Sequence, residues 1–322
     1  FSSFNQLDTP LARAVGRAPR EGILALFRRQ NDERVRFTAI LQRKGIGRSG
    51  SRTWTPPQNN EYLPAVPANL LAYFWTNRFS VSGLLSAAEN SGSISTGLLL
   101  ADLEDWLAAN SSLSLGEFFD LFGSQFGMYV TAIRATGFLP MPRLCFRLQV
   151  HDSRQVEQLL GRLFHHLDVQ HSSIRDIPAH FVKLAGGLIR PAYALDDGFL
   201  IVADSREQLE QVLLGKKNPL VGNGLYKQVD IGLDAANNFI GYFKNGELVD
   251  GFKELALLAG TLMSFGDRRQ GEKISVLAEK VLVPLFEGLK MYRAQSVRIY
   301  GGKDELVMDS ALVPAEHVRG GR

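Results

Sequence analysis

A glycine-rich segment at residues 45–50 is the part of this sequence closest to a nucleotide-binding motif. Gly45, Gly47 and Gly50 have the spacing G-x-G-x-x-G, in which glycines let the backbone approach phosphates at the start of a helix. The residues that follow, 51–57, include two prolines and cannot begin a long helix. The segment therefore favours a flexible basic loop over a phosphate site.

Three histidines lie close together and could be considered as metal ligands. His165, His166 and His171 flank Asp168 near the end of an expected helix. Neighbouring residues on a helix point about 100° apart, so His165 and His166 cannot easily share one ion. The pattern favours a solvated helix terminus, where a protonated imidazole suits the helix dipole.

Two groups of carboxylates also invite a catalytic interpretation. The first group, Asp102, Glu104 and Asp105, lies on the polar side of an amphipathic helix next to Trp106. The second pair, Asp196 and Asp197, precedes a glycine in a sequence typical of a hairpin turn. Both groups are expected to be solvated.

Common catalytic signatures are missing from the sequence. There is no P-loop, no kinase-type His-Arg-Asp, no serine-hydrolase elbow and no H-E-x-x-H pair. Cys145 is the single cysteine and lies in an apolar run, which excludes an intramolecular disulfide and a multi-cysteine metal site. We therefore expect no catalytic, metal-binding or cofactor-binding residue and no cofactor.

The first 60 residues are basic, with 11 Lys and Arg against 4 Asp and Glu. Such a segment could contact an acidic protein or a phospholipid surface, with binding that weakens steeply with salt. No nucleic-acid partner is expected, and a solvated Arg-rich loop is the alternative. The candidate interaction surface comprises Arg28, Arg29, Arg43, Lys44, Arg48, Arg52 and Trp54.

The strongest organising feature is internal similarity. Residues 69–74, which read NLLAYF, match residues 238–243, which read NFIGYF, and each segment is expected to be a strand that runs into a helix. Tyr73 and Tyr242 occupy equivalent positions. Because they recur, these tyrosines and the neighbouring aromatics Phe74, Trp75 and Phe243 favour core packing over a ligand groove.

Other elements follow from local signals. Segments 22–27 and 35–41 predict a hairpin, interpreted as the tail of a truncated third copy. Asp152 and Ser205 are each placed to cap an amphipathic helix, and Asp196-Asp197-Gly198 predicts a tight hairpin turn. Alternation of Leu144, Phe146, Leu148 and Val150 predicts a half-buried strand, and residues 215–224 predict a linker.

These elements predict an α+β fold made of duplicated units, each an antiparallel sheet with helices packed on one face. The expected domains are a basic segment with a hairpin at 1–60, a first α+β lobe at 61–220, and a second lobe at 221–322 that repeats 61–150.

The segments that form these lobes resemble a known family. They are Leu63-Pro64 with Asn69–Phe74, Phe118–Gly123, Arg143–Leu160, Tyr193–Leu213 and Asn238–Phe252. Together they resemble the bacterial domain-of-unknown-function family numbered thirty-three fifty-two. The resemblance implies a secreted or membrane-anchored protein with an N-terminal hydrophobic segment, and it supplies no activity and no functional residue.

Two functions remain open. The first is a non-enzymatic binding or scaffold protein of the bacterial cell envelope, and the alternative is a carrier of a lipid or other hydrophobic ligand in a groove between sheet and helices, suggested by 20 Phe and 8 Tyr. The longest apolar run, 255–265, is too short to span a bilayer. Since the chain begins at Phe1, we expect an extracytoplasmic location with a signal or anchor upstream; oligomeric state is left open.

Overall fold

The computed structural model describes most of the chain, and every structural statement below refers to the described part. It comprises residues 23–30, 34–42, 55–80, 102, 104–109, 113–136, 139–187, 189–214, 219–253, 276, 280, 282–302 and 305–315. The Gly45–Gly50 motif lies outside these residues.

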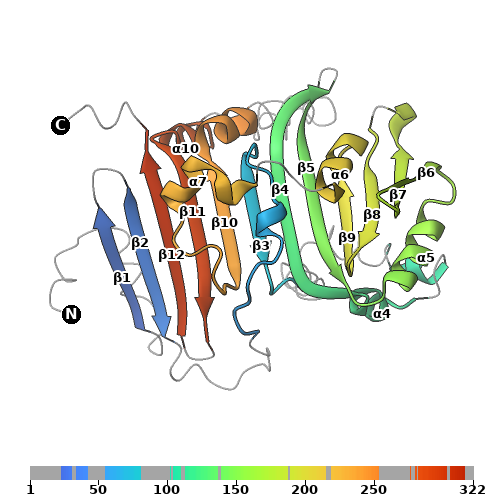
Figure 1. Cartoon of the computed structure of the whole chain (residues 1–322), viewed down its shortest axis with the longest axis horizontal. Coiled ribbons are helices and arrows are strands. Elements are labelled where there is room, and N and C mark those ends of the chain that lie inside the picture. Colours follow the sequence, from blue (N-terminus) through green and yellow to red (C-terminus); the bar gives the residue numbers. More distant parts are fainter. Residues whose placement is uncertain are drawn as a thin grey trace.

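One twelve-stranded antiparallel sheet dominates the fold (Figure 1). Its strand order is β1-β2-β12-β11-β10-β3-β4-β5-β9-β8-β7-β6. The strands are β1 Ile23–Gln30, β2 Val35–Gln42, β3 Ala72–Thr76, β4 Phe122–Thr136, β5 Leu139–Val150, β6 Asp168–Ile174, β7 Ile177–Lys183, β8 Ala192–Asp196, β9 Phe199–Ala203, β10 Phe239–Lys244, β11 Tyr292–Gly301 and β12 Glu305–Pro314.

The predicted fold class, duplicated units of antiparallel sheet with helices on one face, is wrong. The two similar segments are neighbours in a single sheet, because β3 pairs with β10 and Tyr73 lies directly opposite Tyr242. Periodicity shows that a segment is a strand but not which strand it pairs with. Hydrogen bonding across this junction joins what the sequence presented as separate sheets.

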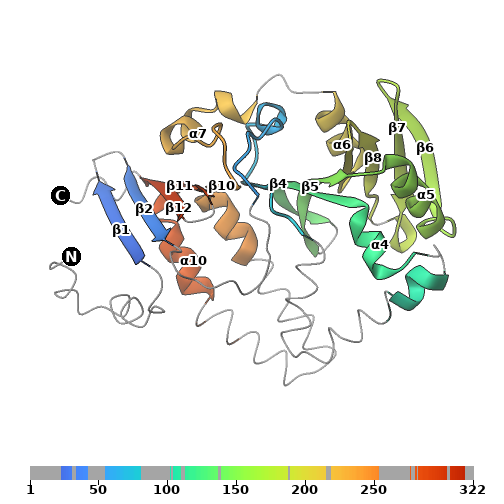
Figure 2. The ribbon, with the colours of Figure 1, turned by 90° about the horizontal axis from the view of Figure 1, so that it is seen from below.

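The helices whose bounds lie within the described residues are short. They are η2 Leu63–Ala65, α4 Leu115–Asp120, α5 Ser153–Leu163, η3 Ala185–Gly187, α6 Arg206–Leu213, η4 Leu220–Gly222, α7 Gly224–Val229 and α10 Val283–Leu289. Residues 104–109 and 245–253 are helical as well. Figure 2 shows α6 and α7 on one side of the sheet and α4 and α10 on the other. We call these sides the α7 face and the α4 face.

Several local predictions are confirmed. Asp152 accepts a hydrogen bond from Gln155 N at the start of α5, and Ser205 Oγ accepts one from Gln208 N at the start of α6. The β8–β9 turn places Asp197 at φ 47° and Gly198 at φ 72°, the positive values that a tight hairpin requires. These signals are local, which is why the sequence reveals them.

The first hairpin is also confirmed, and its partner lies far along the chain. Strands β1 and β2 pair with each other, and β2 then pairs with β12, with Thr38 opposite Asp309. The N-terminal hairpin therefore extends the sheet next to β12, the last strand in the sequence. Its interpretation as the tail of a third copy stays a prediction, as does the division into three domains.

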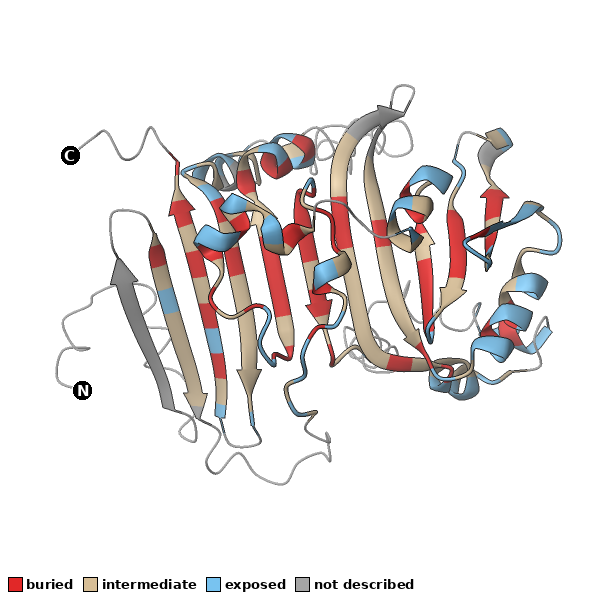
Figure 3. Ribbon diagram, viewed as in Figure 1, coloured by how far each residue is buried: buried red, intermediate tan, exposed pale blue. Residues whose placement is uncertain are grey.

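The core follows the middle of the sheet (Figure 3). Trp75, Ile240 and Tyr242 are each at most 1% exposed, and they lie on β3 and β10 at the junction. Burying a side chain of this size stabilises the fold by roughly 1.5–3 kcal/mol. A second cluster on the α4 face packs α5 residues Val156 and Leu159 against the sheet. Within the described residues, no helix is long and apolar enough to cross a membrane.

Candidate functional site

A single row of residues crosses the α7 face and contains the most informative side chains. Directly paired positions on successive strands, from β2 to β9, are Thr38, Asp309, Arg298, Ile240, Trp75, Gly127, Arg147 and Ile201. We call this series the central row. The β3–β10 junction divides it, with β10, β11, β12 and β2 on one side and β3, β4, β5 and β9 on the other.

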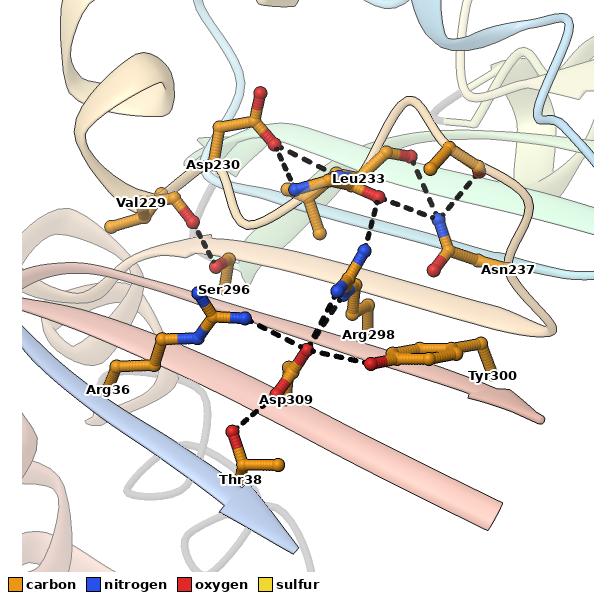
Figure 4. Close-up of polar contacts among 12 residues, drawn as sticks. Arg36, Thr38, Val229, Asp230, Leu233, Asn237, Ser296, Arg298, Tyr300 and Asp309 are labelled. Carbon is orange, nitrogen blue, oxygen red and sulfur yellow. Dashed lines mark hydrogen bonds and ion pairs between the residues drawn. The ribbon is translucent and has the colours of Figure 1, made fainter. Parts of the chain in front are cut away.

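On the β12 side, the central row forms a polar cluster around Asp309 (Figure 4). The Asp309 residue is 1% exposed. Its carboxylate accepts hydrogen bonds from Thr38 Oγ1 at 2.6 Å, Arg298 Nη2 at 2.8 Å and Arg36 Nη2 at 3.1 Å. Tyr300 OH donates a further bond at 3.3 Å. Strands β2, β11 and β12 are thus held by one buried carboxylate.

These partners keep Asp309 ionised. Burial raises the pKa of Asp309, but the hydrogen bonds from Thr38 and Arg298 and the charges of Arg36 and Arg298 outweigh it, so the pKa is lowered overall. A buried carboxylate is stable only when paired and hydrogen-bonded in this way. The three charged side chains of the cluster, Arg36, Arg298 and Asp309, are therefore paired with one another.

A loop covers this polar cluster. Arg298 Nη1 donates to the carbonyl of Gly232 at 3.2 Å, and Asn237 Nδ2 donates to three carbonyls of the same loop, at Gly232, Leu233 and Ala235. Gly232 has φ 96°, a conformation that favours glycine. The loop is therefore tied both to itself and to the sheet.

On the β5 side, the equivalent part of the central row is open. Gly127 lies between Trp75 and Arg147, so the position between these two large side chains carries no side chain at all. An added Cβ at Gly127 would meet nothing closer than Trp75 Cδ1 at 3.7 Å. Adjacent strands are about 4.8 Å apart, so the gap between the Trp75 and Arg147 backbones spans two strand spacings.

Aromatic rings hold Arg147 in place. Its guanidinium carbon lies 3.9 Å from the centre of the Tyr62 ring and 5.2 Å from that of Phe199. Tyr62 comes from the segment that leads into η2 and packs edge-on against Phe199 of β9. The side chain of Arg147 makes no ion pair or hydrogen bond with any described residue, and its Nε is buried without a partner.

Trp75 also has a buried donor without a hydrogen-bond partner. The residue is 1% exposed, and its indole Nε1 is buried without a hydrogen-bond partner among the described residues. A buried donor without a partner costs roughly 1–3 kcal/mol. Both Trp75 and Arg147 line one pocket, together with Tyr62, Ala65, Val66, Tyr73, Gln125, Phe126, Gly127, Tyr129, Cys145, Phe199 and Val212. We call it the Arg147 pocket.

The pocket is small and apolar apart from these donors. The space open to the centre of a water molecule is about 20 Å³, room for roughly one or two waters. Burial raises the pKa of Tyr62 to about 12, and it also raises the pKa values of Tyr73 and Tyr129. These phenols stay neutral at physiological pH, so Arg147 is the charged group of the pocket.

The structure places two of the predicted surface residues and leaves the others undescribed. Arg28 and Arg29 lie on β1, the strand at one edge of the sheet. The remaining five, Arg43, Lys44, Arg48, Arg52 and Trp54, lie outside the described residues, so the basic surface stays a prediction.

The rings of His165 and His166 pack edge-on with their centres 5.3 Å apart, but the other predicted groups have separate partners. His165 bonds the carbonyl of Arg162, and Asp168 pairs with Lys183, whereas His171 contacts His180 on the next strand. In the described part of the chain, no group of three His, Cys, Asp or Glu side chains could hold a metal ion. Asp197 lies in the β8–β9 turn, as predicted.

Sequence reasoning missed Arg147, Trp75 as a donor, and Asp309. Alternation on β5 predicted that Leu144, Phe146, Leu148 and Val150 face the core. The structure instead covers both faces, with Cys145 fully buried and Leu144 only partly buried. A signal did exist, since Cys145 and Arg147 share one face of β5 with no acidic residue beside them.

Comparison with known proteins adds little. No family model matches the chain, and no curated protein matches it. A solved structure, crystal form III of TP0453, is similar over 84% of this chain and 98% of that chain, at 10% identity and a TM-score of 0.34. A likeness this distant carries no argument, and the family resemblance stays a prediction.

Proposed function

We propose that this protein is a non-enzymatic binding protein of the bacterial cell envelope and that it holds a small ligand in the Arg147 pocket. The observation that carries the proposal is the pair of buried, unpartnered donors, Trp75 Nε1 and Arg147 Nε, in one pocket. Native structures rarely leave such donors unsatisfied. A bound ligand with hydrogen-bond acceptors would satisfy both.

The chemistry of the lining supports binding. The pocket combines aromatic walls with a few fixed polar groups, the composition typical of small-molecule sites. Its tyrosines are held neutral by burial, so they offer hydrogen bonds rather than proton exchange at neutral pH. The location in the cell envelope rests on the family resemblance alone, and fractionation of the native host checks it.

A carrier of a lipid or other hydrophobic ligand is the second candidate. Aromatic and aliphatic residues favour an apolar ligand, among them Val66 directly after η2, Phe199 of β9 and Val212 of α6. The space of about 20 Å³ is far too small for a whole acyl chain. A lipid carrier would therefore require the cover formed by η2 and α6 to move away from the sheet.

A fragment screen with a blocked variant tests the proposed function. A mixed panel of small acids, amines and neutral compounds is added to the ¹⁵N-labelled chain, and the indole N–H signal of Trp75 is followed by NMR. We expect some fragments to shift this signal in a saturable way. Gly127→Phe, which fills the pocket, removes the response, and Gly127→Val serves if the larger side chain prevents folding. If no fragment class moves the signal, the proposed function is wrong.

A further inference from the structure

Resting on the proposed function, we infer that the Arg147 pocket binds the carboxylate end of a small apolar monocarboxylic acid. The first step is the donor set. Arg147 supplies a permanent positive charge and an unpartnered Nε–H, and Trp75 supplies an unpartnered Nε1–H. Neither group can accept a hydrogen bond, so the complementary ligand group is an acceptor, and the charge of Arg147 selects an anion.

The second step is the position of these donors. Trp75 and Arg147 are separated in the central row by Gly127 alone, and Trp75 Cδ1 already lies toward Gly127. The two side chains therefore border one space above the glycine. A carboxylate has two acceptor oxygens side by side, which lets one group receive a bond from each donor. Its size is of the order of the space available, about 20 Å³.

The third step is the body of the ligand. Beyond the donors, the pocket is bordered by the rings of Tyr62 and Phe199 and by Ala65, Val66 and Val212. Acidic residues 61, 196 and 197 influence Tyr62 electrostatically, but none of them bonds Arg147. A polar or cationic body would lose its hydration against these walls without new hydrogen bonds. The lining thus favours a straight-chain or aromatic body. Because the carboxylate alone takes up the space of about 20 Å³, such a body also requires the cover formed by η2 and α6 to move away from the sheet.

The fourth step is the contrast with Arg298. That arginine also lies in the central row, but Asp309 accepts its Nε and Nη2 hydrogen bonds at 3.1 and 2.8 Å. Among the described residues, Asp309 is therefore the carboxylate partner of Arg298, whereas no carboxylate pairs with Arg147. A ligand carboxylate would take at Arg147 the part that Asp309 takes at Arg298.

The experiment compares acids with neutral analogues on the whole 322-residue chain. The chain has three tryptophans, so three indole N–H signals are expected, and Trp75→Phe identifies the one that matters. Near neutral pH, hexanoate and phenylpropanoate are expected to shift the Trp75 signal in a saturable way. Hexanol and hexylamine at the same concentrations leave it unchanged.

Matched arginine variants complete the test. Arg147→Met keeps the apolar stem and removes the charge, and it is expected to weaken hexanoate binding roughly tenfold or more; Arg147→Gln replaces it if the first variant does not fold. Arg206→Met is the control, because Arg206 also lies over a phenylalanine ring, Phe181, but outside the pocket. Its hexanoate affinity is expected to equal that of the unmodified chain.

The outcomes separate the two proposals. Equal binding of hexanol and hexanoate, with no effect of Arg147→Met, overturns the carboxylate assignment and leaves the binding function standing. The same holds if other fragments shift Trp75 and the acids do not. If no compound of any class shifts Trp75, both proposals are wrong. Binding of either acid supports the carboxylate assignment. A preference for phenylpropanoate indicates an aromatic body, and a preference for hexanoate indicates an aliphatic one.

Discussion

The two halves of the central row lie on the same sheet but differ in whether their polar side chains have partners. On the β12 side, Arg298 and Arg36 both pair with Asp309, and Arg298 also bonds the loop that covers them. On the β5 side, a glycine stands opposite Arg147, and the arginine and Trp75 keep unpartnered donors. A cluster whose charged groups pair with one another fixes the register of the strands. A cluster with unpartnered donors has groups that could still bond a ligand. The comparison teaches that burial of an arginine alone does not distinguish a structural from a binding role; its partners do.

Removal of Asp309 is expected to have the largest effect. Asp309→Ala leaves Arg298 and Arg36 without their shared acceptor, and breaking a buried ion pair costs about 3–5 kcal/mol. Since Arg36 is partly exposed, we expect the lower end, about 3 kcal/mol. Urea denaturation measures it. A loss below about 1 kcal/mol would contradict the view that this side is a closed structural cluster.

The pH dependence of the same variant sharpens the test. The pKa of Asp309 is lowered in the folded state. The stabilisation from Asp309 is therefore complete above its unfolded pKa, about 4, and is lost as pH falls through the lower folded value. The unmodified chain should lose stability in this acid range more steeply than Asp309→Ala. Parallel curves would show that the carboxylate is not held ionised.

Two glycines give a matched pair with a smaller effect. A Cβ on Gly232 would clash with Arg298 Nη1, and the residue has φ 96°. Gly232→Ala is therefore expected to destabilise the fold by about 2 kcal/mol, mainly through backbone strain. At Gly127 the nearest atom to a new Cβ is 3.7 Å away, so Gly127→Ala should change stability by roughly 0.5 kcal/mol or less. Thermal unfolding compares the stability of the two variants. Equal losses of stability would contradict the view that the β12 side is tightly packed at Gly232 while the β5 side has free space at Gly127.

Arg147→Met is expected to change the stability of the ligand-free chain by less than about 1 kcal/mol. The substitution loses a cation–π contact with Tyr62, worth about 0.5–1 kcal/mol, and removes the buried, unpartnered Nε–H. This is the direct counterpart of Asp309→Ala in the other half. A loss of several kcal/mol in urea denaturation would assign Arg147 a structural role instead.

The sequence predicted local structure well and long-range pairing poorly, and the reason is physical. Caps at Asp152 and Ser205 and the turn at Asp197 depend on residues a few positions apart. The pairing of Thr38 with Asp309 joins residues 271 positions apart, and no periodicity encodes it. The same limit applies to the candidate site, because Trp75, Gly127 and Arg147 meet only when β3, β4 and β5 align. The matched tyrosines, Tyr73 and Tyr242, were correctly expected in the core, but not opposite each other.

The smallest expected effect lies at the far edge of the β5 side, where two histidines face each other. His171 Nδ1 and His180 Nδ1 are 2.8 Å apart on β6 and β7, and such a contact needs one nitrogen to donate and the other to accept. Burial lowers the pKa of His180, the charge of His171 lowers it further, and Glu157 opposes them. Protonation is therefore disfavoured in the folded state, so stability should be complete above the unfolded pKa, about 6.5, and decline as pH falls below it.

His180→Phe keeps the stacking on Tyr193, whose ring centre lies 4.6 Å away, and removes the titrating group. Between pH values of about 6.5 and 5, it should flatten the decline, while Asp309→Ala leaves that part of the curve unchanged. An unchanged slope in His180→Phe would show that the two ends of the sheet do not differ in their response to mild acid.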